Sequence, residues 1–407
     1  MTRDEARARD AADPLRGLRD RFALPDGVIY LDGNSLGALP KTTPARLTDV
    51  VTEQWGRDLI AGWNAHGWIG AAVRAGGAIA PLIGAQADEV LVADSTSVNL
   101  FKLLAAACMA RPERGTILSE PENFPTDLYM AQGVAGMLAG RRVKTVAFDD
   151  LVAAIDDDVA VVLLTHVHYK SGHKRDIAAI TAAAHARGAL VLWDLSHSAG
   201  AVAVDLNGCD VDLAVGCGYK YLNGGPGAPA FLYVARGLQE TLRSPLSGWM
   251  GHAAPFDFHD DYAPAPGIAR FQCGTPPILG IAALEEGVAQ FDGVDLAALF
   301  AKGQALCDLY VALVEERCTG FVLASPRDGA HRGSHVSFAH PHAYAICQAL
   351  IARRVVGDFR APDVLRMGFA PLYTGFEDVW CAVDTLAAVM RERAWNDPAY
   401  RFRAAVT

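Results

Sequence analysis

The 407-residue sequence contains no long uninterrupted hydrophobic run. Its longest candidate, residues 159–164 (VAVVLL), has the length of a single strand, whereas a membrane-spanning helix needs about 20 apolar residues. The N-terminal segment carries charges of both signs and no apolar stretch, so it does not have the pattern of a secretory signal. We therefore expect a cytoplasmic protein without a membrane partner.

The sequence also lacks an excess of positive charge. It has 46 acidic and 36 basic residues, which gives a formal net charge of −10 at pH 7. A general nucleic-acid binder needs a basic face that replaces the counterions of the phosphates, so we expect no nucleic-acid partner. Charged residues make up 20% of the chain and hydrophobic residues 51%, which excludes a disordered or fibrous protein.

Metal-binding and nucleotide-binding motifs are absent as well. None of the eight cysteines forms a CxxC pair, and reduced thiols are the default in such a chain. The pairs His166/His168 and His340/His342 would each share one face of a strand, but no third ligand accompanies them, so we expect no metal site. Neither a Walker A sequence nor a GxGxxG motif after a strand is present.

From about residue 85 onward, short apolar runs alternate with helical periods. This alternation is typical of a mostly parallel sheet with helices on both faces. Residues 159–165 are rich in β-branched side chains, as in a strand that is buried on both faces. The predicted strands cover 89–93, 116–119, 159–165, 190–193 and 213–216, and the predicted helices cover 98–110 and 177–187.

The pattern changes after about residue 280. A long helical period covers 295–318, and residues 335–339 alternate as in an antiparallel strand with 364–369 as its neighbour. A capping box from Thr374 to Glu377 precedes a final helix. We expect an α/β protein in three parts: an N-terminal segment (1–45) that packs with the smaller domain, a large domain (46–285) and a small α+β domain (286–407).

Three polar features fall at predicted strand ends, where open α/β sheets bind their ligands. Residues 95–97 (STS) open a helix whose free N–H groups favour a phosphate, Asp194 follows strand 190–193, and Lys220 follows strand 213–216. A lysine can form a Schiff base with pyridoxal phosphate, and an aspartate can keep its ring nitrogen protonated. Taken singly, each feature is more often a cap, turn or loop residue. Their joint order indicates an enzyme with a phosphate-bearing cofactor.

Longer motifs around these residues make the sequence similar to the kynureninase family. The resemblance covers nearly the whole chain and implies the fold of type I pyridoxal-phosphate enzymes, with a mostly parallel seven-stranded sheet in the large domain and a smaller α+β domain. The motifs are 30–37 (YLDGNSLG), 124–127 (FPTD), 193–200 (WDLSHSAG), 219–227 (YKYLNGGPG), 248–252 (GWMGH), 274–277 (GTPP) and 366–373 (RMGFAPLY).

The resemblance implies hydrolysis of L-kynurenine to anthranilate and L-alanine, and 3-hydroxykynurenine as a second candidate substrate. It also implies pyridoxal 5′-phosphate as cofactor, a role in tryptophan degradation and NAD biosynthesis, and a homodimer with the active site at its interface. Lys220 would be the Schiff-base lysine and proton shuttle, Asp194 the partner of the pyridine nitrogen, and Tyr219 an acid or base.

The resemblance implies further contacts with cofactor and substrate. Phe124 would stack on the cofactor ring, Trp249 would come from the neighbouring subunit, and Arg366 would bind the α-carboxylate of the substrate, which suits its planar fork. The full cofactor-binding set is Thr96, Ser97, Phe124, Pro125, Thr126, Asp127, Thr165, Asp194, His197, Tyr219, Lys220, Trp249 and Thr275, and the substrate-binding set is Arg366, Trp63 and Asn34.

Thr275 stands where animal members of the family carry an asparagine, and Trp63 aligns near their histidine. An apolar Trp63 with a short Thr275 would favour unsubstituted kynurenine, because a ring hydroxyl would lose its polar partner.

Other interpretations stay open at this point. Phe124 and Trp249 could be core aromatics, and Arg366 an ordinary ion-pair residue. A cysteine desulfurase-like lyase would use Cys318 or Cys273 as nucleophile. A third interpretation is a non-catalytic ligand-binding protein of the same fold.

Overall fold

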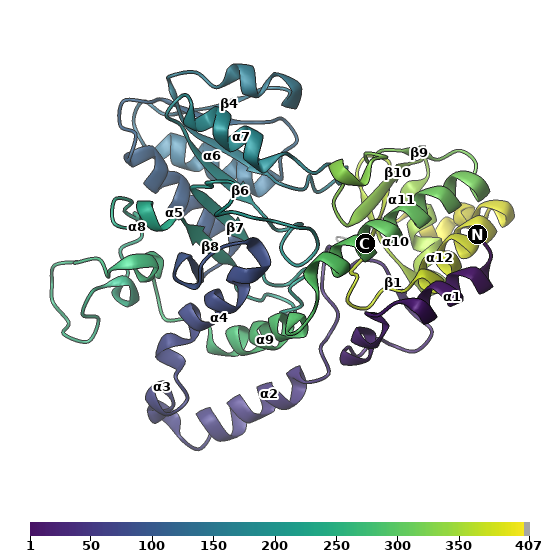
Figure 1. The fold of residues 1–407 in the computed structure, drawn as a ribbon, viewed down its shortest axis with the longest axis horizontal. Helices are drawn as coiled ribbons and strands as arrows, with labels where there is room; N and C mark the ends of the chain where they lie inside the picture. Colours follow the sequence, from purple (N-terminus) through teal and green to yellow (C-terminus); the bar gives the residue numbers. More distant parts are fainter. Residues whose placement is uncertain (403–407) are drawn as a thin grey trace.

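The larger half of the protein is built on a seven-stranded sheet (Figure 1). The computed structural model describes residues 1–402. The strands are β2 (Val90–Val92), β3 (Thr116–Ser119), β4 (Arg142–Thr145), β5 (Val159–Thr165), β6 (Leu190–Asp194), β7 (Leu213–Gly216) and β8 (Phe231–Val234). Their order is β2-β8-β7-β6-β5-β3-β4. Strand β8 is antiparallel to β2 and β7, and the other neighbours pair in parallel.

Helices pack against this sheet and enclose its strands in one hydrophobic core. All seven residues of β5 are buried, as the β-branched run 159–165 predicted. The expected α/β fold with a mostly parallel sheet is therefore confirmed. The helices are α4 (Ala71–Ile79), α5 (Thr96–Met109), α6 (Pro125–Met137), α7 (Ile177–His185), α8 (Arg236–Gln239) and α9 (Ile278–Val288).

A second, smaller sheet of four antiparallel strands lies in the C-terminal part of the chain. Strand β10 pairs with β13 so that Ser337 lies opposite Arg366, and β12 pairs with β13 so that Asp358 lies opposite the same arginine. The sequence predicted the pairing of 335–339 with 364–369. The elements are β9 (Val322–Leu323), β10 (His335–Ala339), β12 (Asp358–Arg360), β13 (Val364–Gly368), α10 (Leu296–Arg317), α11 (Ala343–Ala352) and α12 (Phe376–Glu392).

The N-terminal segment lies on this C-terminal part. Helix α1 (Arg3–Ala12) packs on α12, and β1 (Ile29–Tyr30) pairs in parallel with β11 (Val355–Val356). Ala6 and Leu31 are buried in the hydrophobic core of the C-terminal part. The division into 1–45, 46–285 and 286–407 stays a prediction, because these contacts do not define domain boundaries.

The predicted capping box of the last helix is wrong by one residue. Helix α12 begins at Phe376, and the carboxylate of Asp378 accepts a hydrogen bond from the N–H of Gly375 at 2.9 Å. Asp10 of α1 accepts from the N–H of Phe376 at 2.7 Å, so a distant segment completes the cap. The Thr374 hydroxyl is buried without a partner among the described residues, and Glu377 pairs with the arginines of α1 instead.

Among the described residues, one helix, α10, is long and apolar enough to cross a membrane by length and composition alone. In the fold it packs against α12, and just over half of its most apolar window is buried, as in the core helix of a globular domain.

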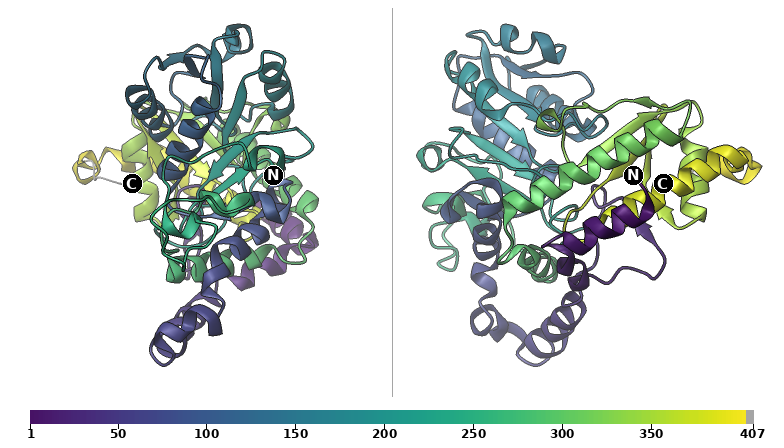
Figure 2. Two further views of the ribbon diagram at one scale, coloured as in Figure 1. Left: turned by 90° about the vertical axis from the view of Figure 1, so that its left-hand side faces the viewer. Right: turned by 45° about the vertical axis from the view of Figure 1, so that its right-hand side comes forward.

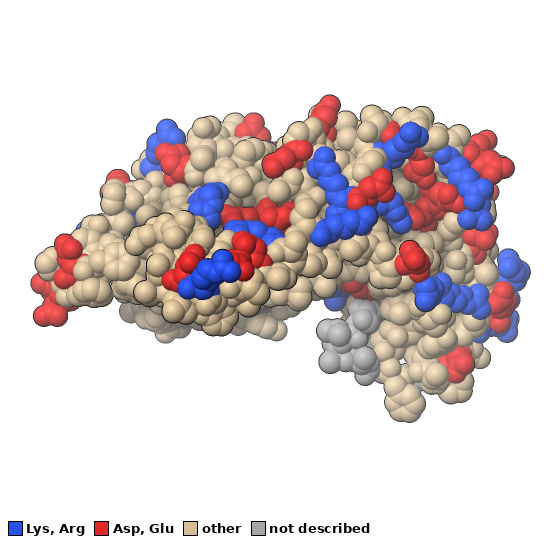
Figure 3. Space-filling view, turned by 90° about the horizontal axis from the view of Figure 1, so that it is seen from below, with Lys and Arg blue, Asp and Glu red and all other residues tan. Residues whose placement is uncertain are grey.

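An arm projects from the body of the molecule (Figure 2). It consists of α2 (Thr43–Asp49), η2 (Val50–Trp55), η3 (Leu59–Ala61) and α3 (Gly62–Ala65). Its large apolar side chains Trp55, Leu59 and Ile60 are exposed. On the face seen from below, acidic and basic side chains are interspersed and neither sign forms a broad patch (Figure 3).

Candidate active site

The predicted lysine and its neighbours meet at the carboxyl ends of β5, β6 and β7. Thr165 at the end of β5 lies opposite Asp194 at the end of β6 in the parallel register. His197 follows β6, Lys220 follows β7, and the Lys220 Nζ lies 3.4 Å from the His197 Nε2. Loops at this end of a parallel sheet carry the ligand sites of open α/β folds.

Aromatic rings surround the lysine amine. The Lys220 Nζ lies 5.7 Å from the centre of the Phe124 ring and 5.8 Å from that of Tyr219. The Tyr169 ring stands edge-on to Phe124 at 5.3 Å. Phe124 is 37% exposed, so core side chains do not cover its ring. The ring therefore offers a surface on which a flat ligand can stack.

Two carboxyl groups are buried beneath this surface. Asp194 accepts a hydrogen bond from the N–H of Ser196 at 2.7 Å, and burial raises its pKa against the opposing charge of Lys220. Burial and the nearby Asp194 raise the pKa of Asp127 further. Thr165 Oγ1 lies 3.2 Å from Asp127 Oδ2, whereas Asp127 Oδ1 has no partner among the described residues. A buried carboxylate without a positively charged partner is unfavourable, so the pair of Asp127 and Asp194 is suited to bind a cationic N–H group.

Two helix N-termini converge next to these groups. Thr96 is the first residue of α5 and Pro125 the first of α6. The hydroxyl oxygens of Ser97 and Thr126 are 3.3 Å apart. Free backbone N–H groups and the helix dipoles at such a junction bind anions, so the predicted hydroxyl residues stand where a phosphate would be held.

These observations fit pyridoxal phosphate. Thr96, Ser97 and Thr126 would hold its phosphate, Asp194 would accept from its ring nitrogen, and Phe124 would cover its ring. Asp127 Oδ1 supports this fit, because a buried carboxyl oxygen without a partner among the described residues leaves a polar atom for a bound group.

Tyr219 and His197 have protonation states set by burial. Burial raises the pKa of the Tyr219 phenol, so the hydroxyl keeps its proton at neutral pH. Burial and the positive charge of Lys220 hold the pKa of His197 well below its usual range, so the imidazole next to the amine is neutral.

Arg366 lies in a buried polar cluster behind this site. Its Nε donates to Asp358 Oδ1 at 2.8 Å, and its Nη2 donates to Asp358 Oδ2 and to Ser35 Oγ, the latter at 3.0 Å. With the amide oxygen of Asn34 turned toward the guanidinium, that oxygen lies 3.0 Å from Arg366 Nε. The two predicted substrate-binding residues Arg366 and Asn34 are thus neighbours.

Three predicted site residues lie apart from this group. Within residues 1–402, no hydrogen bond or ring contact joins Trp63, Trp249 or Thr275 to Lys220. Trp63 lies in α3 of the arm and packs edge-on against Trp68 at 5.9 Å, and Thr275 is exposed. Trp249 is 43% exposed and contacts Phe256.

Asn123 and Asp358 were missed from the sequence. The side-chain oxygen of Asn123 accepts from Thr165 Oγ1 at 2.5 Å and from the N–H of Phe124 at 2.7 Å, which fixes the start of α6. The sequence could have pointed to Asn123 through its position directly before the FPTD motif (124–127). Nothing local marked Asp358, because its role comes from pairing with Arg366 across two strands.

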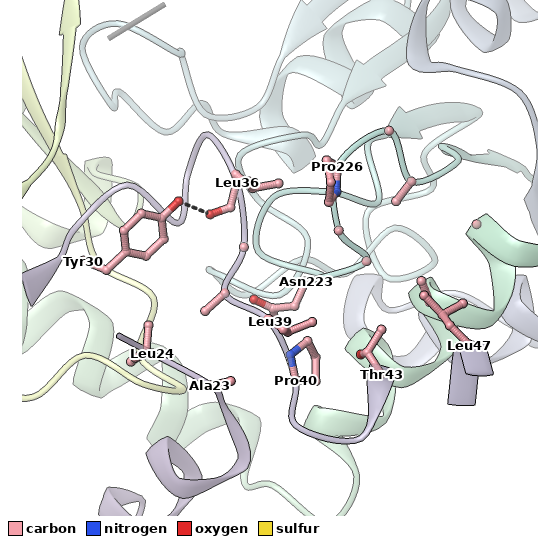
Figure 4. Close-up of a pocket in the computed structure, with 18 of the residues that line it drawn as sticks. Ala23, Leu24, Tyr30, Leu36, Leu39, Pro40, Thr43, Leu47, Asn223 and Pro226 are labelled. Carbon is pink, nitrogen blue, oxygen red and sulfur yellow. Dashed lines mark hydrogen bonds between the residues drawn. The ribbon is translucent and has the colours of Figure 1, made fainter. Parts of the chain in front are cut away.

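A large apolar cavity of about 740 Å³ lies between the N-terminal segment, the glycine-rich loop 223–228 and α9 (Figure 4). Tyr30 Oη donates to the carbonyl oxygen of Leu36 at 2.7 Å at its edge. None of the predicted site residues lines this cavity.

The fold and this site define a class: pyridoxal-phosphate enzymes of fold type I. A cysteine desulfurase from Thermococcus onnurineus NA1 superposes with a TM-score of 0.77 at 20% identity, covering 92% of this chain and 98% of that one. The cysteine desulfurase CsdA from Escherichia coli gives 0.78 at 21% identity, covering 93% and 98%. A C-DES mutant with glycine covalently linked to its PLP cofactor gives 0.76 at 18%, covering 91% and 98%. These identities show a common fold alone.

The sequence comparisons identify the family. The chain is 52% identical over 415 residues to a kynureninase of Burkholderia mallei strain SAVP1 and 50% identical over 414 residues to one of Pseudomonas fluorescens, with 100% of both chains covered in each case. The model of the kynureninase C-terminal domain matches residues 299–386. The chain belongs to the kynureninase family.

This membership confirms the expected enzyme class and cofactor. The protein is a pyridoxal-phosphate-dependent hydrolase with the function of a kynureninase. The cysteine desulfurases are distant relatives in fold only. Cys318 is a poor nucleophile, because burial raises the pKa of its thiol to about 11.

Proposed function

We propose that Lys220, Asp194 and Tyr219 carry out the hydrolysis of L-kynurenine to anthranilate and L-alanine in this enzyme. The observation that carries the proposal is the position of the Lys220 amine, 3.4 Å from the neutral His197 imidazole and 5.7 Å from the Phe124 ring centre. A flat cofactor on Phe124 would have its reactive carbon within reach of this amine.

The bound cofactor supplies an electron sink for the negative charge that develops next to the substrate amino group. Lys220 would take the proton from the substrate Cα and pass it on the same face to the cofactor. Asp194 holds the proton on the ring nitrogen. Burial raises the pKa of the Tyr219 phenol, so the phenol is protonated at neutral pH. After water has attacked the ketone carbon and the Cβ–Cγ bond has broken, Tyr219 would donate this proton to Cβ.

Arg366 and Asn34 would hold the α-carboxylate of the substrate. A charge-assisted hydrogen bond from a guanidinium N–H to the carboxylate would fix the orientation of the Cα–H bond. Trp63 and Thr275 would favour kynurenine over 3-hydroxykynurenine, because neither would give the ring hydroxyl a strong polar partner.

The enzyme would act as a homodimer in the cytoplasm, in tryptophan degradation by the kynurenine pathway and in NAD biosynthesis. Trp249 of one subunit would complete the site of the other. Exposed aromatic side chains on the segment around Trp249 support this assembly, since Trp249, Phe256 and Phe258 are 43%, 57% and 76% exposed.

Product analysis tests the proposal. The purified protein, loaded with pyridoxal phosphate, is given L-kynurenine, 3-hydroxykynurenine or L-cysteine, and anthranilates and sulfide are quantified. We expect anthranilate from kynurenine, less product from the 3-hydroxy form, no sulfide, and no product with Lys220→Ala. Sulfide without anthranilate, or full activity in Lys220→Ala, would overturn it.

A further inference from the structure

The guanidinium of Arg366 is already committed to partners within the protein. Its Nε and Nη2 both donate to Asp358, its Nη2 also donates to Ser35, and its Nη1 donates to the carbonyl oxygen of Tyr169. These bonds use four of the five N–H groups of an arginine. Arg366 is 1% exposed, and the buried Asp358 neutralises its charge. One N–H on Nη1 is therefore left for an incoming carboxylate.

A second arginine stands beside this pair with donors to spare. Arg360 lies two residues after Asp358 on β12, so both side chains are on the same face of the strand. Its Nη2 lies 2.7 Å from Asp358 Oδ2 and 3.3 Å from Ser35 Oγ. Its side chain is 35% exposed, and its Nε is buried without a partner among the described residues. A buried guanidinium N–H without an acceptor is costly, which points to a ligand.

The position of Arg360 connects it to the candidate active site. The positive charges of Arg360 and Arg366 both favour the ionised form of the Tyr169 phenol. The backbone oxygen of Tyr169 accepts a hydrogen bond from Arg366. The Tyr169 ring contacts Phe124, and the Phe124 ring faces the Lys220 amine. An amino acid whose amino group lies at Lys220 could thus extend its carboxylate toward both arginines.

The charges of the cluster also favour an anion. Arg360 and Arg366 carry two positive charges and Asp358 carries one negative charge. Burial and the nearby Asp358 raise the pKa of Asp32, the other carboxyl at the cluster, to about 7, so Asp32 is partly protonated at neutral pH. A net positive charge is left, and a substrate carboxylate would neutralise it.

We propose that Arg360 binds the α-carboxylate of the substrate together with Arg366, with Asp358 holding both guanidinium groups in place. This inference rests on the proposed substrate role of Arg366 and extends it. Arg366 supplies one N–H and the fixed geometry, and Arg360 supplies the uncompensated charge and its free donors.

Steady-state kinetics of the holoenzyme with L-kynurenine test this. In Arg360→Gln we expect KM to rise by about tenfold or more, the usual size for a charge-assisted hydrogen bond, with kcat changed much less. Arg360→Lys restores part of the loss, since it keeps the charge but not the fork. Arg353→Gln is the matched control, because Arg353 is an exposed arginine paired with Glu392 at 2.6 Å.

Inhibition separates carboxylate binding from a structural role. The inhibition constant of L-alanine, which carries the carboxylate, should rise with KM in Arg360→Gln. That of kynurenamine, the substrate without its α-carboxylate, should stay unchanged. Equal shifts for both inhibitors, or an unchanged KM in both Arg360 variants, would overturn the inference.

The Arg366→Lys variant distinguishes this inference from the role of Arg366 itself. A raised KM in Arg360→Gln with an unchanged KM in Arg366→Lys would support Arg360 and reject Arg366. The reverse result would keep Arg366 and reject Arg360. The visible absorbance of the bound cofactor and the thermal midpoint are recorded for each variant. If Arg360→Gln loses both, Arg360→Lys takes its place in the comparison.

Discussion

The amine of Lys220 and the imidazole of His197 are 3.4 Å apart, and burial keeps the imidazole neutral. His197 thus gives the lysine a hydrogen-bond acceptor without adding charge. We expect His197→Phe, which keeps a ring but removes the acceptor, to bind the cofactor and to lower kcat by about tenfold or more, because Lys220 loses an orienting partner for proton transfer. Cofactor absorbance and kcat are measured side by side, and His259→Phe on the surface serves as control. An unchanged kcat would contradict this role.

Asp194 is the second residue that the chemistry requires. Asp194→Asn keeps the shape and a hydrogen bond but cannot hold a proton on the ring nitrogen by charge. We expect kcat to fall by about a hundredfold or more, as when a preorganised electrostatic contact is lost. Asp157→Asn, at an exposed site before β5, should leave kcat unchanged. A variant at position 194 with normal kcat would exclude Asp194 as the partner of the ring nitrogen.

The ion pair of Asp358 and Arg366 has a consequence for stability. Removing one partner leaves a buried charge without compensation, so Asp358→Ala should lower the free energy of unfolding by about 3 to 5 kcal/mol. Denaturant unfolding measures this change. The double variant Asp358→Ala/Arg366→Met should recover part of the loss, because the Arg366 charge is no longer buried without its partner. If the double variant is less stable than the single one, the loss does not come from the uncompensated arginine.

Buried histidines predict a loss of stability in acid. Burial, together with the charge of Lys174, lowers the pKa of His166 to about 3, against about 6.5 in an unfolded chain. Between these values the unfolded state binds an additional proton, so stability falls as the pH falls, by up to about 1.4 kcal/mol per pH unit. The raised pKa values of Asp127 and Asp194 act in the opposite direction, so the comparison is made against a variant.

In that comparison, His166→Gln should lose less stability than the unaltered enzyme when the pH is lowered from 7 to 5. Denaturant midpoints at the two pH values give the result. His259→Gln, an exposed histidine, should behave as the unaltered enzyme does. Equal pH dependence in the enzyme and in His166→Gln would show that His166 is not the group that titrates.

The substrate preference is tested by Trp63→His/Thr275→Asn. We expect the ratio of kcat/KM for 3-hydroxykynurenine to that for kynurenine to rise by about tenfold, since a polar partner for the hydroxyl is introduced. Each single variant should give a smaller change. An unchanged ratio in the double variant would mean that neither residue contacts the aromatic ring of the substrate.

The sequence predicted the elements whose pattern is strong in itself. Strand β5 is a continuous β-branched run, and α10 shows a long helical period that begins after Asp295 and ends at Arg317. Strand β4 was missed, because its sequence RVKT is mostly exposed and polar and it forms only by pairing with β3. Strand β8 was also missed, because its four apolar residues follow a glycine-rich loop and do not reveal their antiparallel partner.

The same distinction holds for the active site. Asp194 and Lys220 were found because the first ends an apolar strand and the second lies in the loop after one, positions that the sequence displays. Arg366 was predicted through the family resemblance, but its partners Asp358 and Ser35 were not, because these contacts depend on strand register and on contact between opposite ends of the chain. The roles of Trp249 and Thr275 stay predictions, since within residues 1–402 of a single subunit neither side chain contacts Lys220.

The most direct test of the account is to identify the lysine that carries the cofactor. The enzyme is loaded with pyridoxal phosphate, reduced with borohydride to fix the link between cofactor and lysine, digested, and mapped by mass spectrometry. The account predicts the pyridoxyl mass on the peptide that contains Lys220, and its loss in Lys220→Ala. The same mass on another lysine, such as Lys102, or no labelled peptide at all, would contradict it.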